Sequence, residues 1–421
     1  MVAGRVGLGE VEPARDLWPE ISIRHNETRG RGWWAWPALA LAAAAAVALF
    51  VVLPGEPAPT ADPKIQRAYD GVVAAERPVP AAAVFTTNMA AAAPVRLSRR
   101  NLAAGPTARA VVLNAGCANA ATGKRGIAVA ELTANRTAEL LACDPEDVLL
   151  CSTGTIGTHL APEAITAGVV DAVAALGGDA ADANAAARAI MTTDSESKEV
   201  TVEGDGFTVG GMAKGAGMIR PDMATMLAVL TTDAVVDPPV LDGALRRAVD
   251  HSFHALNIDG CPSTNDSVIV LASGGSGISA EADALAAALT SAAVDLARRI
   301  AADAEGASRV VTIAVTGAAT DAAARRIGRI VADSVLVRSS FYGADPNWGR
   351  IVGALGEVDE EVDFGDLLIA FAGTTVARSG IGVVVDEDAV RAAMSGDFGV
   401  TVSVGNGQGT ARVFTTDLTP D

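Results

Sequence analysis

The stretch from Lys214 to Thr225, which reads KGAGMIRPDMAT, combines a lysine, a glycine-rich turn and a threonine that follows a small residue. A threonine hydroxyl is a poor nucleophile at neutral pH because its side chain holds no group that takes the proton as the oxygen attacks. If the Ala224–Thr225 peptide bond broke, the freed α-amine, with a pKa of about 7.7 to 8.0, would supply that base. The residue types therefore predict a self-cleavage site that builds its own catalyst.

The same threonine has an ordinary alternative interpretation. Thr225 leads into the apolar run MLAVL, and a threonine in such a place is more often a simple strand residue. Five other segments favour the catalytic interpretation, and they read NAGCANAATG (114–123), CSTGTIG (151–157), STND (263–266), DAEGAS (303–308) and DPNWGRI (345–351). Together with KGAGMIRPDMATML, in this order and spacing, they resemble the ornithine acetyltransferase (glutamate N-acetyltransferase) family from about Ala75 to Asp421.

This resemblance implies an activity and a fold. Members of the family cut themselves before the threonine of the MATML motif, which places the cleavage here between Ala224 and Thr225. The threonine then carries acetyl from N-acetylornithine to glutamate in a ping-pong reaction, with acetyl-CoA as a second donor in some members and no bound cofactor. The implied fold is α/β, a layered α-β-β-α sandwich of mixed sheets of the self-cleaving N-terminal-nucleophile type. The two subunits stay together as a heterotetramer of two alpha and two beta chains.

The resemblance also implies roles for four further residues. Thr153 and Gly154 of the CSTG motif match the oxyanion hole, where losing one donor costs about 2.7 to 4 kcal/mol of barrier. Lys214 and Glu305 match the family's substrate contacts, together with Thr225. A fixed cation and a fixed anion suit substrates that carry a carboxylate and an amine or amide. Each charge taken alone would be read as a solvated surface residue.

Other polar residues in these motifs are assigned to structure. Asparagine beside glycine usually satisfies backbone groups in tight loops, so Asn114, Asn119, Asn347 and Trp348 are left out of the catalytic set. His159, His251 and His254 lack a partner at zinc-ligand spacing, and packing or solvent exposure is expected for them. The four cysteines, at 117, 143, 151 and 261, form no CxxC pair, so no metal site or redox motif is predicted.

The composition and the periodicity of the sequence limit which fold classes and which classes of partner are possible. A chain of 421 residues, half of them hydrophobic, can bury a large core. A net charge of −18 argues against nucleic acid as a partner, because phosphate contacts need clustered Lys and Arg. Short apolar runs predict strands at 109–114, 147–151, 268–272 and 310–315, a hairpin of 199–202 with 207–210, and a strand beginning at Thr225. Helical spacing predicts helices at 126–142, 164–176, 240–253, 280–302 and 321–332.

The N-terminal residues depart from the family pattern. Residues 1–55 contain an uncharged run from Trp33 to Leu53 that is long enough to span a bilayer, and arginines precede it. A membrane helix, a cleaved signal and a misassigned start codon are the alternatives for this run. A membrane is a partner only if residues 33–53 insert; otherwise the resemblance implies a cytoplasmic enzyme. The proline-rich residues 56–74 are predicted to be a linker, before an alpha part at 75–224 and a beta part at 225–421.

Two further departures bear on the site. Family members usually continue beyond the point that matches TTDLTPD, with an asparagine and a terminal Ser or Thr that hold the substrate, and Cys261 stands where they commonly have an acidic residue. Two other functions therefore stay open beside the acetyltransferase. One is an N-terminal-nucleophile amidase or peptidase, in which water takes the acyl group, and the other is an inactive, truncated relic that keeps the fold.

Overall fold

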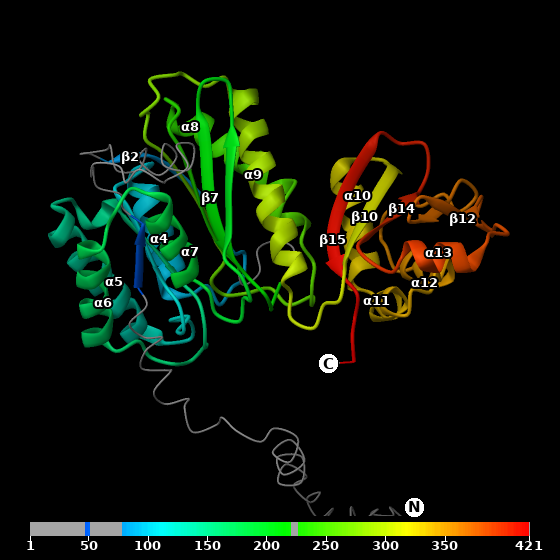
Figure 1. The fold of residues 1–421 in the computed structure, drawn as a ribbon, viewed down its shortest axis with the longest axis horizontal. Helices are drawn as coiled ribbons and strands as arrows, with labels where there is room; N and C mark the ends of the chain where they lie inside the picture. Colours follow the sequence, from blue (N-terminus) through cyan, green and yellow to red (C-terminus); the bar gives the residue numbers. More distant parts are fainter. Residues whose placement is uncertain (1–46, 51–77, 220–225, 421) are drawn as a thin grey trace, which may run out of the picture. The chain divides into compact units, whose positions relative to one another are not determined.

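The computed structural model describes residues 47–50, 78–219 and 226–420 of the 421-residue chain. These residues form a six-stranded sheet and a three-stranded sheet in the first part of the chain, and a second six-stranded sheet in the C-terminal part (Figure 1). Most of the predicted site residues that the structure describes lie near the ends of strands in the first six-stranded sheet and in the three-stranded sheet.

The first six-stranded sheet has the strand order β3-β2-β9-β8-β7-β6. Only β8 and β9 run parallel, and the other pairs are antiparallel. The residues of β7, β8 and β9 are buried throughout, as expected for strands that are covered on both faces. The strands are β2 (Val79–Phe85), β3 (Thr107–Ala108), β6 (Lys198–Glu203), β7 (Thr208–Lys214), β8 (Leu227–Thr232) and β9 (Ser267–Ala272).

The three-stranded sheet packs face to face on the first sheet. It contains β1 (Val47–Phe50), β4 (Ala110–Asn114) and β5 (Val148–Ser152), with β4 and β5 parallel and β1 antiparallel to β4. Side chains of β4 and β5 share one hydrophobic cluster with side chains of β7, β8 and β9; Leu113 and Cys151 lie in this cluster with Met212 and Val229.

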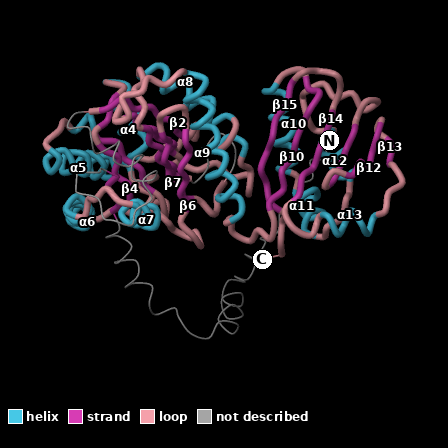
Figure 2. Tube along the Cα trace, turned by 45° about the horizontal axis from the view of Figure 1, so that its top comes forward, coloured by secondary structure: helices cyan, strands magenta, loops and turns pink. Residues whose placement is uncertain are grey.

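Helices cover the outer faces of both sheets (Figure 2). On the three-stranded sheet, α4 (Ala93–Ala104), α5 (Gly123–Leu141) and α6 (Pro162–Ala174) pack against β4 and β5. On the six-stranded sheet, α8 (Pro238–Asp250) and α9 (Ala282–Ala302) pack against β7, β8 and β9. The layers therefore run helix, sheet, sheet, helix, which confirms the predicted α-β-β-α sandwich.

The connecting elements of this part are short. α7 (Ala180–Ala189) begins at a capping box formed by Asp179 and Asp182, and it precedes the β6–β7 hairpin. Single turns of 3₁₀ helix, η2 (Pro145–Asp147) and η3 (Phe253–Ala255), come before β5 and after α8.

The C-terminal part is built on the sheet of order β13-β12-β11-β14-β10-β15, in which β10 and β14 are parallel. Its strands are β10 (Val310–Ala318), β11 (Leu368–Phe371), β12 (Thr374–Arg378), β13 (Ile381–Gly382), β14 (Phe398–Ser403) and β15 (Gly409–Thr416). Its helices are α10 (Asp321–Asp333), α11 (Val335–Tyr342), α12 (Trp348–Leu355) and α13 (Glu387–Ala393).

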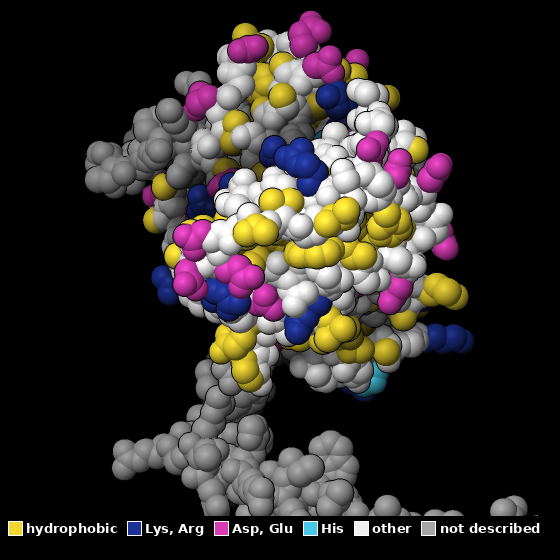
Figure 3. All heavy atoms as spheres, turned by 90° about the vertical axis from the view of Figure 1, so that its right-hand side faces the viewer, with side chains coloured by type: hydrophobic (Ala, Val, Ile, Leu, Met, Phe, Trp, Pro, Cys, Tyr) yellow, Lys and Arg dark blue, Asp and Glu magenta, His cyan; other side chains and the backbone are white. Residues whose placement is uncertain are grey.

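The face of the C-terminal part that Figure 3 presents mixes acidic, basic and hydrophobic side chains, and no cluster of one sign dominates it. Exposed hydrophobic residues of this part include Ile381 on β13 and Val383 and Val384 directly after it. These residues lie at the edge of the sheet, far along the chain from the motifs that predict chemistry.

The predicted elements agree with the observed ones within a few residues at their ends. β4, β5, β9, β10 and the β6–β7 hairpin lie where strands were predicted, and α5, α6, α8, α9 and α10 lie where helices were predicted. The predicted helix at 240–253 ends earlier, at Asp250; His251 and Ser252 form a turn, and Phe253 begins η3. The strand after the hairpin is β8, which begins at Leu227; Thr225 itself lies outside the described residues.

Four residues of the predicted hydrophobic span, Val47–Phe50, form strand β1, paired with Val111–Asn114 of β4, and are not helical. The rest of residues 33–53 lies outside the described part of the chain. Within the described residues, no helix has the length and apolar character needed to cross a bilayer.

Candidate active site

Lys214 is the last residue of β7, and it pairs with Leu227 at the start of the neighbouring strand β8. Leu227 in turn pairs with Ser267 at the start of β9. One end of the sheet therefore carries the end of β7 and the beginnings of β8 and β9. Lys214, Met226 and Asp266 are brought together there.

Thr153 and Gly154 come directly after β5, in the packed three-stranded sheet. The Thr153 amide donates to the Asn114 carbonyl at 2.9 Å, which continues the pairing of β5 with β4. Gly154 has a φ of +126°, and a Cβ on it would come within 2.3 Å of the Gly116 carbonyl carbon. Only glycine fits this conformation and this close approach.

The turn carries two hydrogen-bond donors that have no acceptor in the described part of the chain. Among the residues that the structure describes, the Gly154 N–H has no acceptor, and the Thr153 hydroxyl donates to none. Thr153 is buried and Gly154 is half-buried. An N–H and an O–H on consecutive residues, engaged by no described acceptor, are the donor set that an oxyanion hole needs.

The ammonium of Lys214 lies next to these donors. Its Nζ donates to Thr192 Oγ1 at 2.7 Å and to Thr153 Oγ1 at 3.4 Å. Burial lowers the pKa of Lys214, whereas the charge of Asp194, whose carboxylate oxygen is 3.6 Å away, acts in the opposite direction. Lys214 is therefore a cation shielded from water, and its Nζ lies next to the Thr153 hydroxyl.

Glu305, the predicted anionic contact, reaches the same segment from the loop after α9. Its amide donates to the carbonyl of Ala216, two residues after Lys214, at 2.7 Å. The Glu305 side chain is exposed. The structure thus brings Thr153, Gly154, Lys214 and Glu305 into one region, with a buried cation and an accessible anion.

Asp194 and Thr192 belong to the same region, although the sequence reasoning missed both. They lie between α7 and β6, in the sequence MTTD, and Asp194 Oδ1 accepts from the Gly215 amide at 2.7 Å. Burial raises the pKa of Asp194, but the Lys214 charge and the hydrogen bonds from Lys198 and Gly215 outweigh it and hold the pKa below its usual range. Lys198 and Thr192 lie within four residues of Asp194, but Lys214 and Gly215, which connect it to the site, lie about twenty residues further along the chain, so the sequence around Asp194 gave no signal of its role.

Asp266, the last residue of the STND motif, is a second buried acid at this end of the sheet. Its Oδ1 accepts from the Met226 amide at 3.0 Å, and its Oδ2 has no hydrogen-bond partner among the described residues. Burial raises the pKa of Asp266 well above its usual range, despite the Met226 hydrogen bond and the Lys214 charge. Asp266 therefore fixes the backbone at the residue that follows Thr225.

The asparagines assigned to structure do bind backbone groups, as predicted. Asn114 Nδ2 donates to the Cys117 carbonyl and Asn119 Nδ2 to the Gly126 carbonyl, both at 2.9 Å. Asn347 caps the N-terminus of α12 through the Arg350 amide, and Trp348 is the first residue of that helix.

The histidines lie where the sequence suggested. His251 is the C-terminal cap of α8, His254 lies 3.1 Å from the Asp250 carboxylate, and His159 is exposed. The four cysteines are free thiols, and the described residues contain no cluster of acidic, histidine or cysteine side chains that could hold a metal ion.

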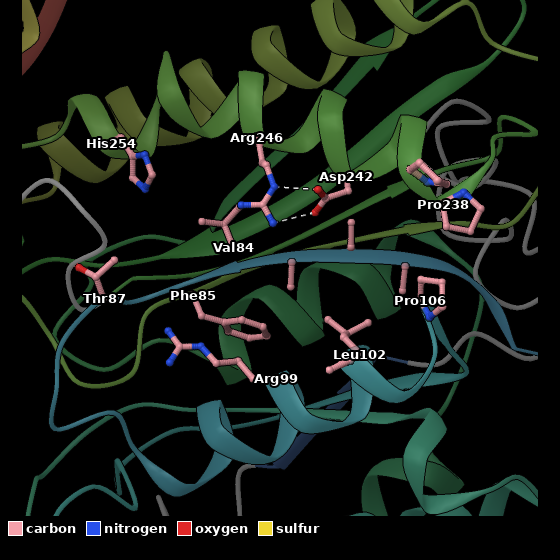
Figure 4. A pocket seen from close by; sticks show the side chains of 15 residues that line it. Val84, Phe85, Thr87, Arg99, Leu102, Pro106, Pro238, Asp242, Arg246 and His254 are labelled. Atoms are coloured by element: carbon pink, nitrogen blue, oxygen red, sulfur yellow. Dashed lines mark hydrogen bonds and ion pairs between the residues drawn. The ribbon is translucent and has the colours of Figure 1, made fainter. Parts of the chain in front are cut away.

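A cavity of about 720 Å³ lies elsewhere, between α4, β2 and α8 (Figure 4). Three of its charged side chains are engaged within the cavity: Arg246 pairs with Asp242 at 2.7 Å, and Arg99 lies over the ring of Phe85. None of the predicted site residues lines it.

Ala224 and Thr225, the predicted cleavage pair, lie outside the described residues. The described residues on either side, Ile219 and Met226, are both held by acidic side chains: the Ile219 amide donates to Asp259 and the Met226 amide to Asp266.

A layered α/β sandwich with a buried lysine and two adjacent donors that no described residue engages is the arrangement expected of an enzyme of the acyl-transfer class. The chain belongs to the ArgJ family, whose model matches residues 60–421. This match begins before the motifs do, inside the segment predicted to be a linker.

Relatives of known name agree with this membership. The chain is 44% identical over 341 residues to the arginine biosynthesis bifunctional protein ArgJ of Thermobifida fusca, covering 81% of this chain and 88% of the relative. The protein of the same name from Mycobacterium leprae is 44% identical over 344 residues, covering 80% and 84%.

Two solved structures are also similar. The arginine biosynthesis bifunctional protein of Bacillus halodurans is 34% identical, with a TM-score of 0.44, over 45% of this chain and 93% of that chain. The ornithine acetyltransferase of Mycobacterium tuberculosis, solved with ornithine, is 41% identical, with a TM-score of 0.33, over 34% of this chain and 77% of that chain.

Proposed function

We propose that the chain transfers an acetyl group from N-acetylornithine to glutamate, with Thr225 as nucleophile after cleavage between Ala224 and Thr225. Membership in the ArgJ family makes it an acyltransferase of arginine biosynthesis. The observation that supports the assignment of the site is the Gly154 N–H, which has no acceptor among the residues that the structure describes, beside the Thr153 hydroxyl, with Lys214 Nζ 3.4 Å from that hydroxyl oxygen.

In the first half-reaction, the hydroxyl oxygen of Thr225 attacks the acetyl carbonyl of N-acetylornithine while the freed α-amine of Thr225 accepts the hydroxyl proton. Negative charge forms on the carbonyl oxygen, where the Gly154 N–H and the Thr153 O–H stabilise it. The bond between the acetyl carbon and the ornithine nitrogen then breaks, and the departing amine takes the proton.

In the second half-reaction, the amine of glutamate attacks the acetyl-threonine ester and releases the threonine hydroxyl. Both substrates carry a carboxylate and an amine or amide, so Lys214 and Glu305 can orient either one. The Lys214 side chain is only 2% exposed, and exclusion from water strengthens its attraction for a carboxylate.

Two finer points belong to the same proposal. The relatives are named bifunctional, and we assign acetyl-CoA as the donor to glutamate in the second function. We also assign the processed chain to a heterotetramer, in which two alpha chains that end at Ala224 join two beta chains that begin at Thr225.

Incubation with N-acetylornithine alone tests the mechanism, because a ping-pong enzyme then stops at the acetyl-enzyme. Mass analysis should show one added acetyl group on the fragment that begins at Thr225, and addition of glutamate should remove it as N-acetylglutamate. Release of free acetate in place of N-acetylglutamate would identify an amidase. Absence of both would identify an inactive relic.

A further inference from the structure

We infer that Asp194 is a positioning residue, which holds the Lys214 ammonium at the substrate site while Lys198 and Asp303 hold Asp194 itself. The inference rests on the proposed function, in which Lys214 binds the substrate carboxylate. It adds to that function the group that keeps Lys214 in place.

Both carboxylate oxygens of Asp194 are engaged, and the side chain is fully buried. Oδ1 accepts from Lys198 Nζ at 2.9 Å and from the Gly215 amide at 2.7 Å. Oδ2 accepts from the Thr192 amide at 3.1 Å and lies 3.6 Å from Lys214 Nζ. One acid thus binds the lysine, the backbone directly after it, and the backbone of the threonine that the lysine contacts.

A second acid completes the arrangement from the other side. Asp303 lies 2.5 Å from Lys198 Nζ and accepts from the Ser195 amide at 3.0 Å. Asp303 is two residues before Glu305, whose amide donates to the Ala216 carbonyl. The segment around Asp194 is therefore tied to both proposed substrate contacts, the cation and the anion.

The four charged groups alternate in sign in the order Lys214, Asp194, Lys198, Asp303. The side chains of the two lysines are 2% and 0% exposed, so neither can rely on water. A buried charge is tolerated only when it is paired and hydrogen-bonded. Asp194 is the one member that neutralises both lysines.

The groups that face Lys214 predict the effect of losing this acid. Asp194 and Asp266 favour the charged ammonium, whereas burial and Lys198 disfavour it. Asp194 is the larger of the two favourable influences and accepts no proton near neutral pH, because its own pKa is held low. Without its charge, Lys214 loses its proton at a lower pH than in the parent protein.

The experiment measures KM for N-acetylornithine against pH in Asp194→Asn, which keeps the side-chain shape and an acceptor oxygen. In the parent protein, KM should stay constant up to a higher pH than in Asp194→Asn. In Asp194→Asn, KM should begin to rise at lower pH, reaching about tenfold above the parent for each unit by which the Lys214 pKa falls. A KM profile that coincides with the parent's would overturn the inference.

A double-mutant cycle with Lys214→Met separates a role through Lys214 from a general structural role. If Asp194 acts through Lys214, Asp194→Asn should change KM by no more than about twofold in the Lys214→Met background, within the ordinary error of additivity. Full, independent effects of the two changes would overturn the inference. An unchanged KM in Lys214→Met alone would instead reject Lys214 as a substrate contact, and with it the proposed site.

Two further variants serve as a matched control and as a replacement if Asp194→Asn does not fold. Asp242→Asn makes the same change in an exposed ion pair with Arg246, and it should leave the KM profile unchanged. If Asp194→Asn is insoluble, Asp194→Asn combined with Lys198→Met removes a cation together with the anion. Because Lys198 itself disfavours the Lys214 ammonium but less strongly than Asp194 favours it, KM should still begin to rise at lower pH than in the parent, by a smaller amount than in Asp194→Asn. A parent-like profile in that soluble double variant would contradict the role of Asp194.

Discussion

The ammonium of Lys214 lies 3.4 Å from the hydroxyl oxygen of Thr153, and the two residues belong to different sheets, 61 positions apart in the chain. Lysine can only donate, so the Thr153 oxygen is the acceptor and its proton stays available for another group. The contact therefore joins the proposed substrate cation to the proposed oxyanion donor. Because its proton is available, the Thr153 hydroxyl can act as the oxyanion donor that the family resemblance implied.

Replacing Thr153 with Ala should lower kcat by about a hundredfold to a thousandfold, because one preorganised donor to the oxyanion is lost. Thr153→Ser keeps the hydroxyl and should retain most of the activity. Steady-state kinetics on both variants, with self-cleavage followed by gel electrophoresis, provides the measurement. Equal rates in Thr153→Ala and the parent would remove the hydroxyl from the mechanism.

Gly154→Ala should reduce both stability and activity. An alanine Cβ would have to share space with the Gly116 backbone and adopt a φ of +126°, a strain of about 1 to 3 kcal/mol before the clash is counted. Gly157 offers a matched control, because its φ is +82° but a Cβ there meets no atom within 4 Å. Urea unfolding should show a clearly larger loss for Gly154→Ala than for Gly157→Ala, and similar losses would contradict the close approach.

Glu305→Gln should raise KM for both substrates and leave stability almost unchanged, because the side chain is exposed and its backbone amide makes the contact to Ala216. The removed charge is the part that attracts a substrate ammonium. Glu357→Gln, at another exposed glutamate, is the control for a general change in surface charge. An unaltered KM in Glu305→Gln would mean that this carboxylate does not meet the substrate.

Asp266 predicts a pH dependence of stability. Its folded pKa is raised above the unfolded value, so the folded chain keeps a proton that the unfolded chain loses near pH 4. Stability therefore falls as pH rises from about 3.9 toward the folded pKa. Asp266→Asn keeps the acceptor for the Met226 amide and removes this loss.

The free energy of unfolding of Asp266→Asn, relative to that of the parent, should thus increase between about pH 4.5 and pH 7.5, because only the parent loses stability over this range. Urea titrations at the two pH values measure it. A variant that becomes relatively less stable at the higher pH would show that Asp266 is ionised in the folded protein, paired with Lys214.

The sequence predicted those helices and strands whose signal lies within their own residues. Apolar runs bounded by turn residues marked β4, β5 and β9, and the turn residues Glu203–Gly206 between two alternating runs marked the β6–β7 hairpin. Each of these signals lies within the element itself. The short strands at the C-terminal end, such as β13 with two exposed residues, carry no comparable pattern and were not predicted.

Only those site residues that belong to the sequence motifs were predicted. Thr153, Gly154, Lys214 and Glu305 came from matched motifs, and the structure brings them together. The contribution of Asp194 depends on contacts with Lys198, Gly215 and, through Lys198, with Asp303, more than a hundred residues away. Lys198 lies only four residues after Asp194, but Gly215 lies 21 positions from Asp194 and Asp303 lies 105 positions from Lys198, and these partners become neighbours only when β6, β7 and the loop after α9 pack together.

The most direct test of the account is the intact mass of the purified protein, measured together with acetyl transfer. The account predicts two fragments, the second beginning at Thr225, and for Thr225→Ala a single uncut chain that transfers no acetyl group. A parent chain that stays whole across the Ala224–Thr225 bond and still moves acetyl from N-acetylornithine to glutamate would contradict it.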